Sequence, residues 1–596
     1  MSLAKTSVKV GAALAEALWL TAAIWLLRGY VWPWLSPVEV SPLQAALDPT
    51  LFQHDFVVQE SLRFTPRFYY NGLILLTVRA GLSLPWAFAA WHCVALGGIV
   101  TGLRAIARTL GFGAVASAVL VVWALNAKAG ELGAVFLYTH GPVPAVWAGA
   151  LAVWGIAAAL RGRWTAAFAC FGGAALLQFL VGFYAGLLVL PALWRERGVR
   201  GAVPPLGAWA LGLALVYLPL WASEASTAGL LGNAVFVEIY AQLRHPHHLV
   251  PSTWSWAAWS QTALFYAGGV WCCRRLGAPR TSRERGLLAV ALALTGLLLV
   301  ANFLWVEVWP WALVAKLQPA RATPFAQLAL LVALAGAVQA LWSRRDYAGA
   351  ALVAAAPLSP YPGCLLLLGA VLLFQAPASL TWRHAVLAGA TLLAYHSGLG
   401  STAASAAQTA VWTATFLALL IPVWFARRPA WRLAAALGGG TGALACAFAS
   451  QSPAWPRAME GHFAIDARPF DAPGELGRRF GQHAPKDAIV LLPPTGDVWT
   501  FKLFARRAVV VDDKNFPFTS RGMAEWKERM DAVLGTPLTR GLDAEGSWAA
   551  QPPARVAVVA NRYGARYVLT RDVWHPSLRG TVVDRLQGWT LWELAP

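Results

Sequence analysis

The chain has 596 residues, of which 58% are hydrophobic and 13% are charged, and its mean hydropathy is +0.54. An ordinary soluble domain carries about 25% charged residues, so charge is too scarce here to cover a water-exposed surface. The net charge of +19 does not indicate a nucleic-acid partner. The basic residues lie between apolar segments, whereas nucleic-acid sites gather them on one water-facing patch interleaved with aromatic residues.

Apolar segments long enough to cross a lipid bilayer recur along the first 450 residues. A crossing takes roughly 20 apolar residues, because the backbone must form its hydrogen bonds within its own segment. Two pairs of segments, 164–194 and 347–376, could each be a broken helix or two re-entrant halves, so we predict about 13 to 15 helices. The candidate spans are 8–32, 86–107, 112–127, 141–160, 164–177, 180–194, 205–222, 257–273, 286–304, 325–342, 347–358, 361–376, 385–397, 407–425 and 432–450.

Basic residues fall in every second loop between these spans, which is the pattern that cytoplasmic Lys and Arg produce. They are Lys5 and Lys9, Arg104 and Arg108, Arg161 and Arg163, Arg195–Arg200, Arg274–Arg285, Arg344 and Arg345, and Arg427–Arg432. The N-terminus is therefore expected in the cytoplasm. The loops 33–85, 126–140, 223–256 and 305–324 and the C-terminal region are then expected on the outer face, where a functional site should lie.

The composition changes near residue 451, where apolar runs shorten and polar residues return. We therefore predict a transmembrane domain over 1–450 and an outer α/β domain over 451–596, because short apolar strands alternate there with segments of helical periodicity. The strands are expected at 488–492, 508–512, 566–570 and 589–594, and the helices at 474–482, 521–533 and 554–563. Acids after the second strand suggest a binding crevice or, alternatively, ion pairs that stabilise the domain.

The first outer loop gathers acids and bases directly after the first span. Its candidate side chains are the acids Asp48, Asp55 and Glu60 and the bases His54, Arg63 and Arg67. Carboxylates can accept a proton from a hydroxyl group or hold a divalent cation, and Arg can hold phosphate. The alternative is a solvated loop whose Asp residues cap turns or helices. Residues 68–82 are apolar but contain Asn71 and Arg79, which favours an interfacial or re-entrant helix.

Two later outer loops carry further basic residues. They contribute Arg244, His245, His247 and His248 from 223–256, and Lys316 and Arg321 from 305–324. Imidazoles can bind a metal or carry a proton, and the cations can contact phosphate. Adjacent His residues on an irregular loop rarely all face one metal, so phosphate contact, metal binding and an ordinary surface loop all stay open.

Four polar groups lie within the predicted spans, namely Glu16, His92, Gln178 and His396. Such groups usually face the interior of a helical bundle or a cavity. A cavity at mid-depth lined by Glu16, His92 or Gln178 would indicate a transporter or a lipid-handling protein, whereas an outer cavity joining the first loop to 244–248 would indicate group transfer.

The layout resembles the GT-C superfamily of polytopic glycosyltransferases, and most closely an uncharacterised family of bacterial membrane proteins with that organisation. The resemblance is carried by Leu47–Val57, Arg244–His248, Gln318–Arg321, Ala505–Ala508, Asp513, Lys514, Glu525 and Trp526. It implies that Asp55 or Asp48 is the catalytic base or holds a cation, and that Arg244, Arg321 and the His cluster contact the phosphate of a polyprenyl-phosphate-linked donor.

From the resemblance and the residues together, we expect a bacterial inner-membrane protein with a periplasmic C-terminal domain. It would transfer a sugar or a related group from a polyprenyl-phosphate donor to an acceptor on the outer face, with Glu60 as a third candidate acid. His54, Arg63, Arg67 and Lys316 are further candidate substrate contacts. A divalent cation held by Asp48, Asp55 and His247 is one option for a cofactor. A transporter and a non-catalytic assembly factor are the alternatives.

Overall fold

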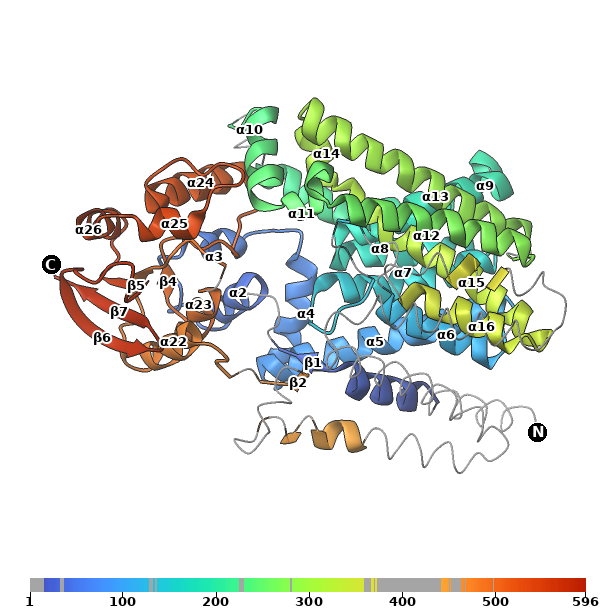
Figure 1. The fold of residues 1–596 in the computed structure, drawn as a ribbon, viewed down its shortest axis with the longest axis horizontal. Helices are drawn as coiled ribbons and strands as arrows, with labels where there is room; N and C mark the ends of the chain where they lie inside the picture. The colour runs from blue at the N-terminus through green and yellow to red at the C-terminus, as the bar shows by residue number, and fades with distance from the viewer. Residues whose placement is uncertain are drawn as a thin grey trace.

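The computed structural model describes most of the chain as helices joined to a small mixed sheet (Figure 1). It describes residues 16–32, 37–127, 132–224, 230–278, 281–358, 366–371, 441–451 and 462–595, apart from residues 134, 136, 369, 447, 450, 467 and 497. The predicted spans 385–397 and 407–425, and His396, lie outside these residues. Most of the spans 361–376 and 432–450 lies outside them as well.

The helices of the membrane part agree with the predicted spans to within a few residues. They are residues 16–28, α5 (Leu84–Thr109), α6 (Ala114–Asn126), α7 (Pro144–Leu160), α8 (Trp164–Leu177), α9 (Phe179–Glu224), α12 (Trp256–Arg275), α13 (Ser282–Phe303), α15 (Thr323–Ser343) and α16 (Tyr347–Ala355), with the short turn η6 (Ala356–Leu358) after α16. Two predicted spans, 180–194 and 205–222, fall in α9, which is interrupted at Gly198 with φ 61° and ψ −176°. The polytopic helical architecture is thus confirmed.

Four helical segments of the described residues are long and apolar enough to cross a membrane. They are Leu84–Thr109, Phe179–Glu224, Arg283–Val308 and Ala312–Ser343. Shorter apolar helices cover Ala114–Asn126, Pro144–Leu160, Trp164–Leu177 and Tyr347–Leu358. The predicted total of about 13 to 15 helices also depends on residues outside the description, so it stays a prediction.

Helices α8 and α9 pack closely enough that glycine is needed at their contact. A Cβ atom added at Gly212 would lie 2.4 Å from the carbonyl oxygen of Gly172, and one at Gly182 would lie 2.3 Å from that of Phe171. Small residues allow helix backbones to approach in a membrane, where association depends on packing rather than on expelling water.

We therefore expect Gly212→Val to lower the stability of the helical part by about 1–3 kcal/mol, because the added methyl groups would overlap the backbone of α8. Gly207 is the matched control on the same helix, since a Cβ there meets no atom within 4 Å. Thermal unfolding of both valine variants in detergent measures the difference. Equal melting temperatures would contradict the close contact.

Basic loops gather at one end of the helices, as the orientation rule predicted. Arg161 Nε donates to Thr109 Oγ1 at 2.8 Å. Arg283 forms two hydrogen bonds with Glu196, at 2.6 and 2.7 Å, and a third with the carbonyl oxygen of Leu160 at 2.7 Å. These contacts join four loops from distant parts of the sequence, at the end of the bundle away from the C-terminal domain (Figure 1).

Short elements fill the space between the opposite end of the helices and the C-terminal domain. They are α2 (Pro37–Leu47), α3 (Phe56–Ser61), α4 (Phe68–Arg79), α10 (Asn233–Val237), η2 (Glu238–Arg244), α11 (Pro246–Leu249), η3 (Pro251–Thr253), η4 (Leu304–Val308), α14 (Ala312–Leu317) and η5 (Pro319–Ala322). The helix expected over 68–82 is α4, and it runs at a steep angle to α5 and α13 (Figure 1). All three charged outer loops thus face the C-terminal domain.

The C-terminal domain contains the α/β layer that the sequence predicts. Its sheet has the order β4-β3-β5-β7-β6, in which β4, β3 and β5 are parallel and β7 and β6 are antiparallel additions. The strands are β3 (Ile489–Leu491), β4 (Ala508–Val509), β5 (Tyr567–Arg571), β6 (Gly580–Leu586) and β7 (Trp589–Leu594). The helices are α22 (Ala472–His483), α23 (Trp499–Ala505), α24 (Ser520–Leu534), α25 (Ala544–Ala549) and α26 (Pro553–Arg562). Strand β6 was not predicted, because most of its residues are exposed.

The two parts of the chain are also joined by a two-stranded parallel pair. Strand β1 (Tyr30–Val31), directly after the first helix, pairs with β2 (Phe463–Ala464), which leads into the C-terminal domain. Gly29 precedes β1 with φ +79°, and a Cβ there would lie 2.1 Å from the carbonyl oxygen of His462. Glycine is therefore required where the first helix leaves the bundle.

Candidate functional site

Asp55 connects the first outer loop to the edge of the C-terminal sheet. Its carboxylate caps α3 by accepting the Val58 N–H at 3.0 Å, and it accepts the N–H of Val509 in edge strand β4 at 3.2 Å. It also forms an ion pair with Lys502 at 2.8 Å. One side chain thus satisfies an orphan helix donor and an unpaired strand donor, which would otherwise need water.

Lys502 is a buried ammonium group held between two carboxylates. Asp55 lies 2.8 Å and Asp512 3.1 Å from its Nζ atom, and the three side chains are 0–2% exposed. Burial alone would lower the pKa of Lys502, but Asp512 and Asp55 together raise it, so the ammonium form is stabilised. Asp512 additionally accepts the backbone and side-chain N–H groups of Asn515.

This geometry favours a positioning role for Asp55. A catalytic base needs an oxygen that can accept a proton from the substrate, whereas both oxygens of this carboxylate are already bound to internal partners. The Lys502 ammonium also supplies the positive charge that a metal ion would bring. The sequence did not indicate Lys502 as a partner, because the two residues are far apart in the chain.

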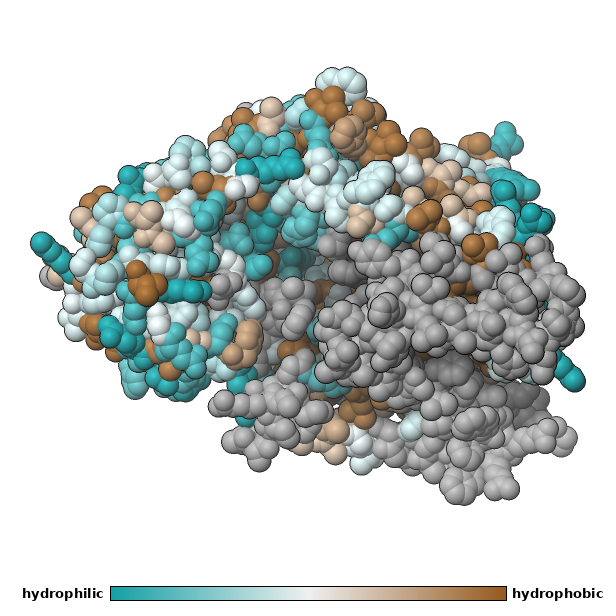
Figure 2. Space-filling model, in the orientation of Figure 1, coloured by the Kyte–Doolittle hydropathy of each residue, from teal (hydrophilic) through white to brown (hydrophobic). Residues whose placement is uncertain are grey.

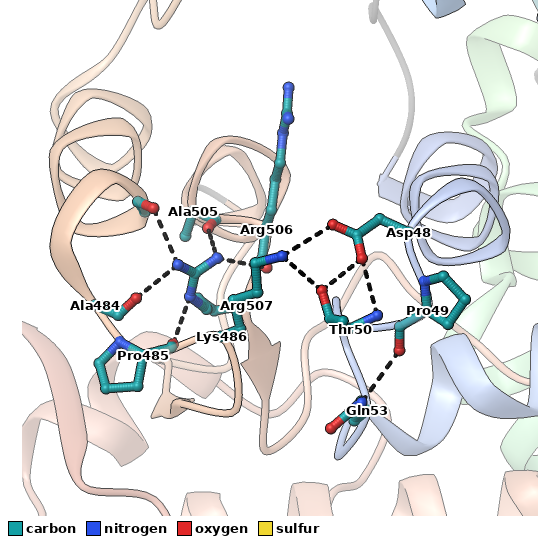
Figure 3. Close-up of polar contacts among 11 residues, drawn as sticks. Asp48, Pro49, Thr50, Gln53, Ala484, Pro485, Lys486, Ala505, Arg506 and Arg507 are labelled. Atoms are coloured by element: carbon teal, nitrogen blue, oxygen red, sulfur yellow. Dashed lines mark hydrogen bonds and ion pairs between the residues drawn. The ribbon is translucent and has the colours of Figure 1, made fainter.

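Asp48 lies at a second, exposed junction with the C-terminal domain (Figure 3). Its carboxylate accepts the backbone and hydroxyl hydrogens of Thr50, and Lys486 lies 3.2 Å away. The hydrogen bonds from Thr50, followed by Lys486, lower the pKa of Asp48. Arg507 holds the segment that carries Lys486, because its guanidinium donates to the carbonyl oxygens of Ala484 and Pro485, each at 2.7 Å.

Asp48→Asn is expected to leave the melting temperature of the protein nearly unchanged, because exposed ion pairs contribute little. If Asp48 were the catalytic base, the same variant would abolish turnover. Thermal unfolding and a transfer assay on the same preparation separate these outcomes, with Lys486→Met as the control that removes the ion pair alone.

The remaining charged residues of the first loop have separate neighbours. Glu60 accepts the Thr519 hydroxyl hydrogen at 2.8 Å and pairs with Arg63 at 3.4 Å, where the Arg63 side chain is 70% exposed. His54 is exposed. Arg67 pairs with Glu39 at 2.7 Å, and its guanidinium lies over the ring of Phe518 in the C-terminal domain.

Four cations from four separate segments converge at the junction of the helices and the C-terminal domain. We call Arg67, Arg244, Arg321 and Lys514 the outer cation cluster. The charges of Arg321, Arg67 and Arg244 all act on the buried hydroxyl of Tyr240. Arg244, Lys514 and Arg321 likewise act on His247. Figure 2 shows hydrophilic side chains gathering where the two parts of the molecule meet.

Within the described residues, no carboxylate forms an ion pair with Arg244, Arg321 or Lys514. Arg244 Nη2 donates to the carbonyl oxygen of Lys514 at 2.8 Å, and Arg321 Nε donates to Gln318 Oε1 at 2.6 Å. Arg67 has Glu39 as its partner. The cluster therefore has an excess of positive charge, which suits an anionic group with several acceptor oxygens, such as phosphate.

Gln318 positions Arg321 from a strained backbone conformation. Its φ of 46° and ψ of 66° are left-handed, which is uncommon outside glycine, and Pro319 follows directly. Its amide group bonds to the Tyr240 hydroxyl at 2.5 Å and to Arg321 at 2.6 Å. Strain of this kind persists where the surroundings fix a functional geometry.

Two imidazoles beside the cluster have a defined tautomer. His248 Nδ1 lies 2.6 Å from the carbonyl oxygen of Gly133, and His245 Nδ1 lies 3.0 Å from that of Tyr240. A carbonyl oxygen can only accept, so each Nδ1 carries the hydrogen and each Nε2 is left as an acceptor. Burial, followed by the charge of Arg321, lowers the pKa of His248 to about 3, so its ring is neutral.

Other predicted ligands lie apart from this cluster. Lys316 pairs with Glu224 at 2.7 Å and lies over the ring of Phe236. No group of three or more His, Cys, Asp or Glu side chains suited to a metal ion occurs in the part of the chain that the structure describes. The proposed metal ligands Asp48, Asp55 and His247 have different neighbours, as given above.

One acid that adjoins the outer cation cluster is Glu39, which the sequence analysis did not select. It is 6% exposed, its Oε1 atom pairs with Arg67, and its Oε2 atom has no hydrogen-bond partner among the described residues. Burial raises the pKa of Glu39, and Arg67 opposes that shift. The feature of the sequence that could have identified Glu39 is its position as a single acid among valines and prolines shortly after the first span.

The fold and the site together define a polytopic membrane protein whose charged outer loops meet a C-terminal α/β domain. Residues 473–533 match a family described as a domain of unknown function, DUF6798. No curated protein matches the chain.

Solved structures similar to the chain include an archaeal oligosaccharyltransferase, AglB from Archaeoglobus fulgidus, in complex with an inhibitory peptide and a dolichol-phosphate. It shares 10% sequence identity with a TM-score of 0.40, over 96% of this chain and 72% of that one. A second oligosaccharyltransferase structure from the same organism, in the apo form, shares 11% identity with a TM-score of 0.36, over 95% of this chain and 72% of that one. Both matches extend over most of the chain.

Proposed function

We propose that this protein transfers a sugar or a related group from a polyprenyl-phosphate-linked donor to an acceptor on the side of the membrane that carries the C-terminal domain. The observation that carries the proposal is the outer cation cluster, in which Arg244, Arg321 and Lys514 have no carboxylate partner among the described residues. Its position at the ends of the apolar helices suits a ligand with a lipid tail and a phosphate. We place this side in the periplasm of a bacterium, with residues 1–450 as the membrane domain and 451–596 outside it.

The residues suggest a division of chemical roles. Glu39 accepts the proton of the acceptor hydroxyl, whose oxygen then attacks the anomeric carbon of the donor sugar. The bond from that carbon to the phosphate oxygen breaks, and the lipid phosphate leaves with the electron pair. Arg244, Arg321 and Lys514 stabilise the charge of the departing phosphate. The Nε2 atoms of His245 and His248 are acceptors suited to sugar hydroxyl groups.

The polar groups within the spans support transfer over transport. Glu16 pairs with Arg104, near the basic end of α5, whereas His92 Nε2 lies 3.2 Å from the hydroxyl oxygen of Tyr138 nearer the outer end. His92 and Arg104 are separated along α5 by roughly 18 Å, given the rise of an α-helix. These two groups therefore lie at different depths along α5 and do not share one cavity, which favours transfer.

The first experiment measures binding of labelled undecaprenyl phosphate to the purified full chain. Arg244→Gln should weaken binding by about tenfold, because it removes a charge-assisted contact without removing the bulk of the side chain. Arg63→Gln is the matched control, since Arg63 is an exposed arginine of the outer face. Equal binding by both variants would overturn the assignment of the outer cation cluster as the phosphate site.

Turnover with polyprenyl-phosphate sugars then tests the carboxylate. Glu39→Gln should bind the lipid phosphate normally and lose transfer by about 100-fold or more, as expected when a general base is removed. Asp55→Asn, Asp48→Asn and Glu60→Gln, which alter the acids predicted from the sequence, complete the series. If Glu39→Gln keeps its transfer activity while one of these three variants loses it, the residue altered in that variant is the catalytic base.

The pH dependence gives an independent check on Glu39. Only the carboxylate form accepts a proton, and burial raises the pKa of this residue. Transfer should therefore increase as the pH rises, with a midpoint above the usual range for glutamate. Glu39→Asp should retain a pH profile of the same sign, whereas a wild-type profile without this rise would contradict the role of Glu39.

A further inference from the structure

Buried hydrogen-bond donors without acceptors gather where the first helix ends. We call Trp25, Arg28, Tyr30 and His92 the buried donor group; they come from the helix 16–28, from β1 and from α5. In each of them one polar atom is shielded from solvent and has no hydrogen-bond partner among the described residues, namely Nε1, Nε, the hydroxyl oxygen and Nδ1 in that order. Buried polar atoms are nearly always bonded, so this group requires a ligand or ordered water. The proposed transfer reaction uses none of these residues.

The members of the buried donor group are neighbours in the fold. Trp25 and Arg28 are three residues apart in one helix, so they share a face of it. The ring centroids of Trp25 and Tyr30 are 5.8 Å apart, and those of Tyr30 and His92 are 5.1 Å apart. The ring centroid of Tyr138 lies 5.7 Å from that of His92 and 5.7 Å from Arg28 Cζ. The four donors therefore lie within one small region, which Tyr138 closes on one side.

Each of these groups offers a hydrogen rather than a lone pair. The indole nitrogen of Trp25 and the guanidinium nitrogen of Arg28 can only donate. Tyr138 can donate its hydroxyl hydrogen to His92 Nε2, 3.2 Å away, which leaves Nδ1 as the donor of that ring. Several donors without an acceptor suit an anion better than water, because a water molecule brings two hydrogens that need acceptors of their own.

Arg28 adds a positive charge that no carboxylate balances within the described part of the chain. Its Nη1 atom donates to Asn126 Oδ1 at 2.6 Å, and its guanidinium faces the ring of Tyr138, so both partners are neutral. The end of the first helix supplies a partial charge of about −0.5, which offsets only half of the guanidinium charge. A charge shielded from water without a full counter-charge is costly, so this position calls for a negative ligand.

We infer that the buried donor group binds one halide ion, which is chloride under physiological conditions. The ion lies among Arg28 Nε, the Tyr30 hydroxyl and His92 Nδ1. A monoatomic anion accepts hydrogen bonds from any direction, and it is small enough for a site whose aromatic walls are 0–6% exposed. Tyr30 lies in β1, and the ring of Trp25 packs on Phe463 of β2 at 4.9 Å. The ion therefore fixes the end of the first helix against the strand pair that leads into the C-terminal domain.

Binding of radioactive chloride to the purified full chain in gluconate buffer tests the site, independently of the proposed transfer reaction. We expect one bound ion per chain. The melting temperature should be about 3–6 °C higher in potassium chloride than in the same concentration of potassium gluconate, because a ligand of the folded state stabilises it. Arg28→Gln should weaken chloride binding by about tenfold or more and remove this difference. Arg79→Gln is the matched control, because Arg79 is an exposed arginine that also ends a helix.

Three further variants locate the ion. Tyr30→Phe removes one donor and keeps the ring, so it should weaken chloride binding by about three- to tenfold, and it tests the site even if Arg28→Gln does not fold. Tyr347→Phe is its control, since Tyr347 is exposed. Arg244→Gln alters the outer cation cluster and should keep the chloride-dependent rise in melting temperature.

Each contrary result would overturn the inference in a distinct way. Wild-type chloride binding in both Arg28→Gln and Tyr30→Phe would remove the site. Loss of the chloride effect in Arg244→Gln would assign the ion to the outer cation cluster. A wild-type chain that binds no chloride and melts alike in both salts would mean that water satisfies the donors. Stabilisation by inorganic phosphate but not by chloride, lost in Arg28→Gln, would replace the halide with an oxyanion.

Discussion

Lys502→Met should destabilise the C-terminal domain by about 3–5 kcal/mol, because breaking a buried ion pair leaves uncompensated charge out of water. The substitution would leave Asp55 and Asp512 buried and facing each other without the ammonium between them. The repulsion between the two carboxylates and their desolvation both lower the stability of the folded state. Thermal unfolding of the full chain and the rate of trypsin cleavage within residues 462–595 would both report the loss.

Two further variants test the cause of this loss. Asp55→Asn combined with Lys502→Met and Asp512→Asn removes all three charges, while the asparagine that replaces Asp55 keeps one of the two acceptor oxygens that serve the N–H groups of Val58 and Val509. This triple variant should recover much of the stability, since neutral replacements of a buried ion cluster are often tolerated. Lys486→Met removes an exposed ammonium at the same junction and should cost less than about 1 kcal/mol. If Lys502→Met has the same melting temperature as the wild type, the buried cluster does not stabilise the junction of the helical part with the C-terminal domain.

Arg321→Ala should weaken binding of undecaprenyl phosphate by roughly 10- to 100-fold, because a hydrogen bond to a charged group contributes about 1.5–3 kcal/mol. We expect a larger effect here than at Arg244, since Gln318 and Tyr240 hold the guanidinium in a fixed orientation. Arg321→Lys should give an intermediate affinity, because an ammonium group keeps the charge but lacks the planar fork that binds two oxygens. Equilibrium binding in detergent measures all three proteins.

The controls separate ligand binding from folding. Arg63→Ala removes an exposed outer arginine and should leave the affinity unchanged. Binding by the wild type should also weaken as the salt concentration rises, though less than for an exposed site, since the cluster is partly shielded from solvent. Wild-type affinity in Arg321→Ala, together with a lowered melting temperature, would assign Arg321 to the fold and not to the ligand.

The membrane helices could be located from the sequence because their signal is local. An apolar segment such as 86–107 forms a helix in a membrane regardless of its neighbouring segments, because lipid offers the backbone no other hydrogen-bond partners. The basic loops at Arg161 and Arg283 meet at one end, as the alternation of charge predicted. The strands at 488–492 and 566–570 were likewise recognisable as short buried runs. Strand β6 was missed because an exposed strand carries no apolar run.

The roles of the acids depended on tertiary structure. In the sequence, Asp48, Asp55 and Glu60 are equivalent candidates in one loop, and Glu39 is an isolated acid among apolar residues. In the folded chain, Asp55 forms an ion pair with Lys502. Asp48 accepts a hydrogen bond from Thr50 and pairs with Lys486. Glu39 instead lies beside the outer cation cluster, where it pairs with Arg67. The partners come from residues hundreds of positions away, so no local pattern could identify them.

Sequence by itself therefore determined that this is a polytopic membrane protein with charged loops and a C-terminal α/β domain. Hydrophobic length and the distribution of Lys and Arg fix those features through the energy of placing each segment in lipid or water. Only the tertiary structure decided which charges are neutralised and which are left available. The chemistry of a carboxylate or a guanidinium is set by its burial and its nearest partner, and both arise from long-range packing.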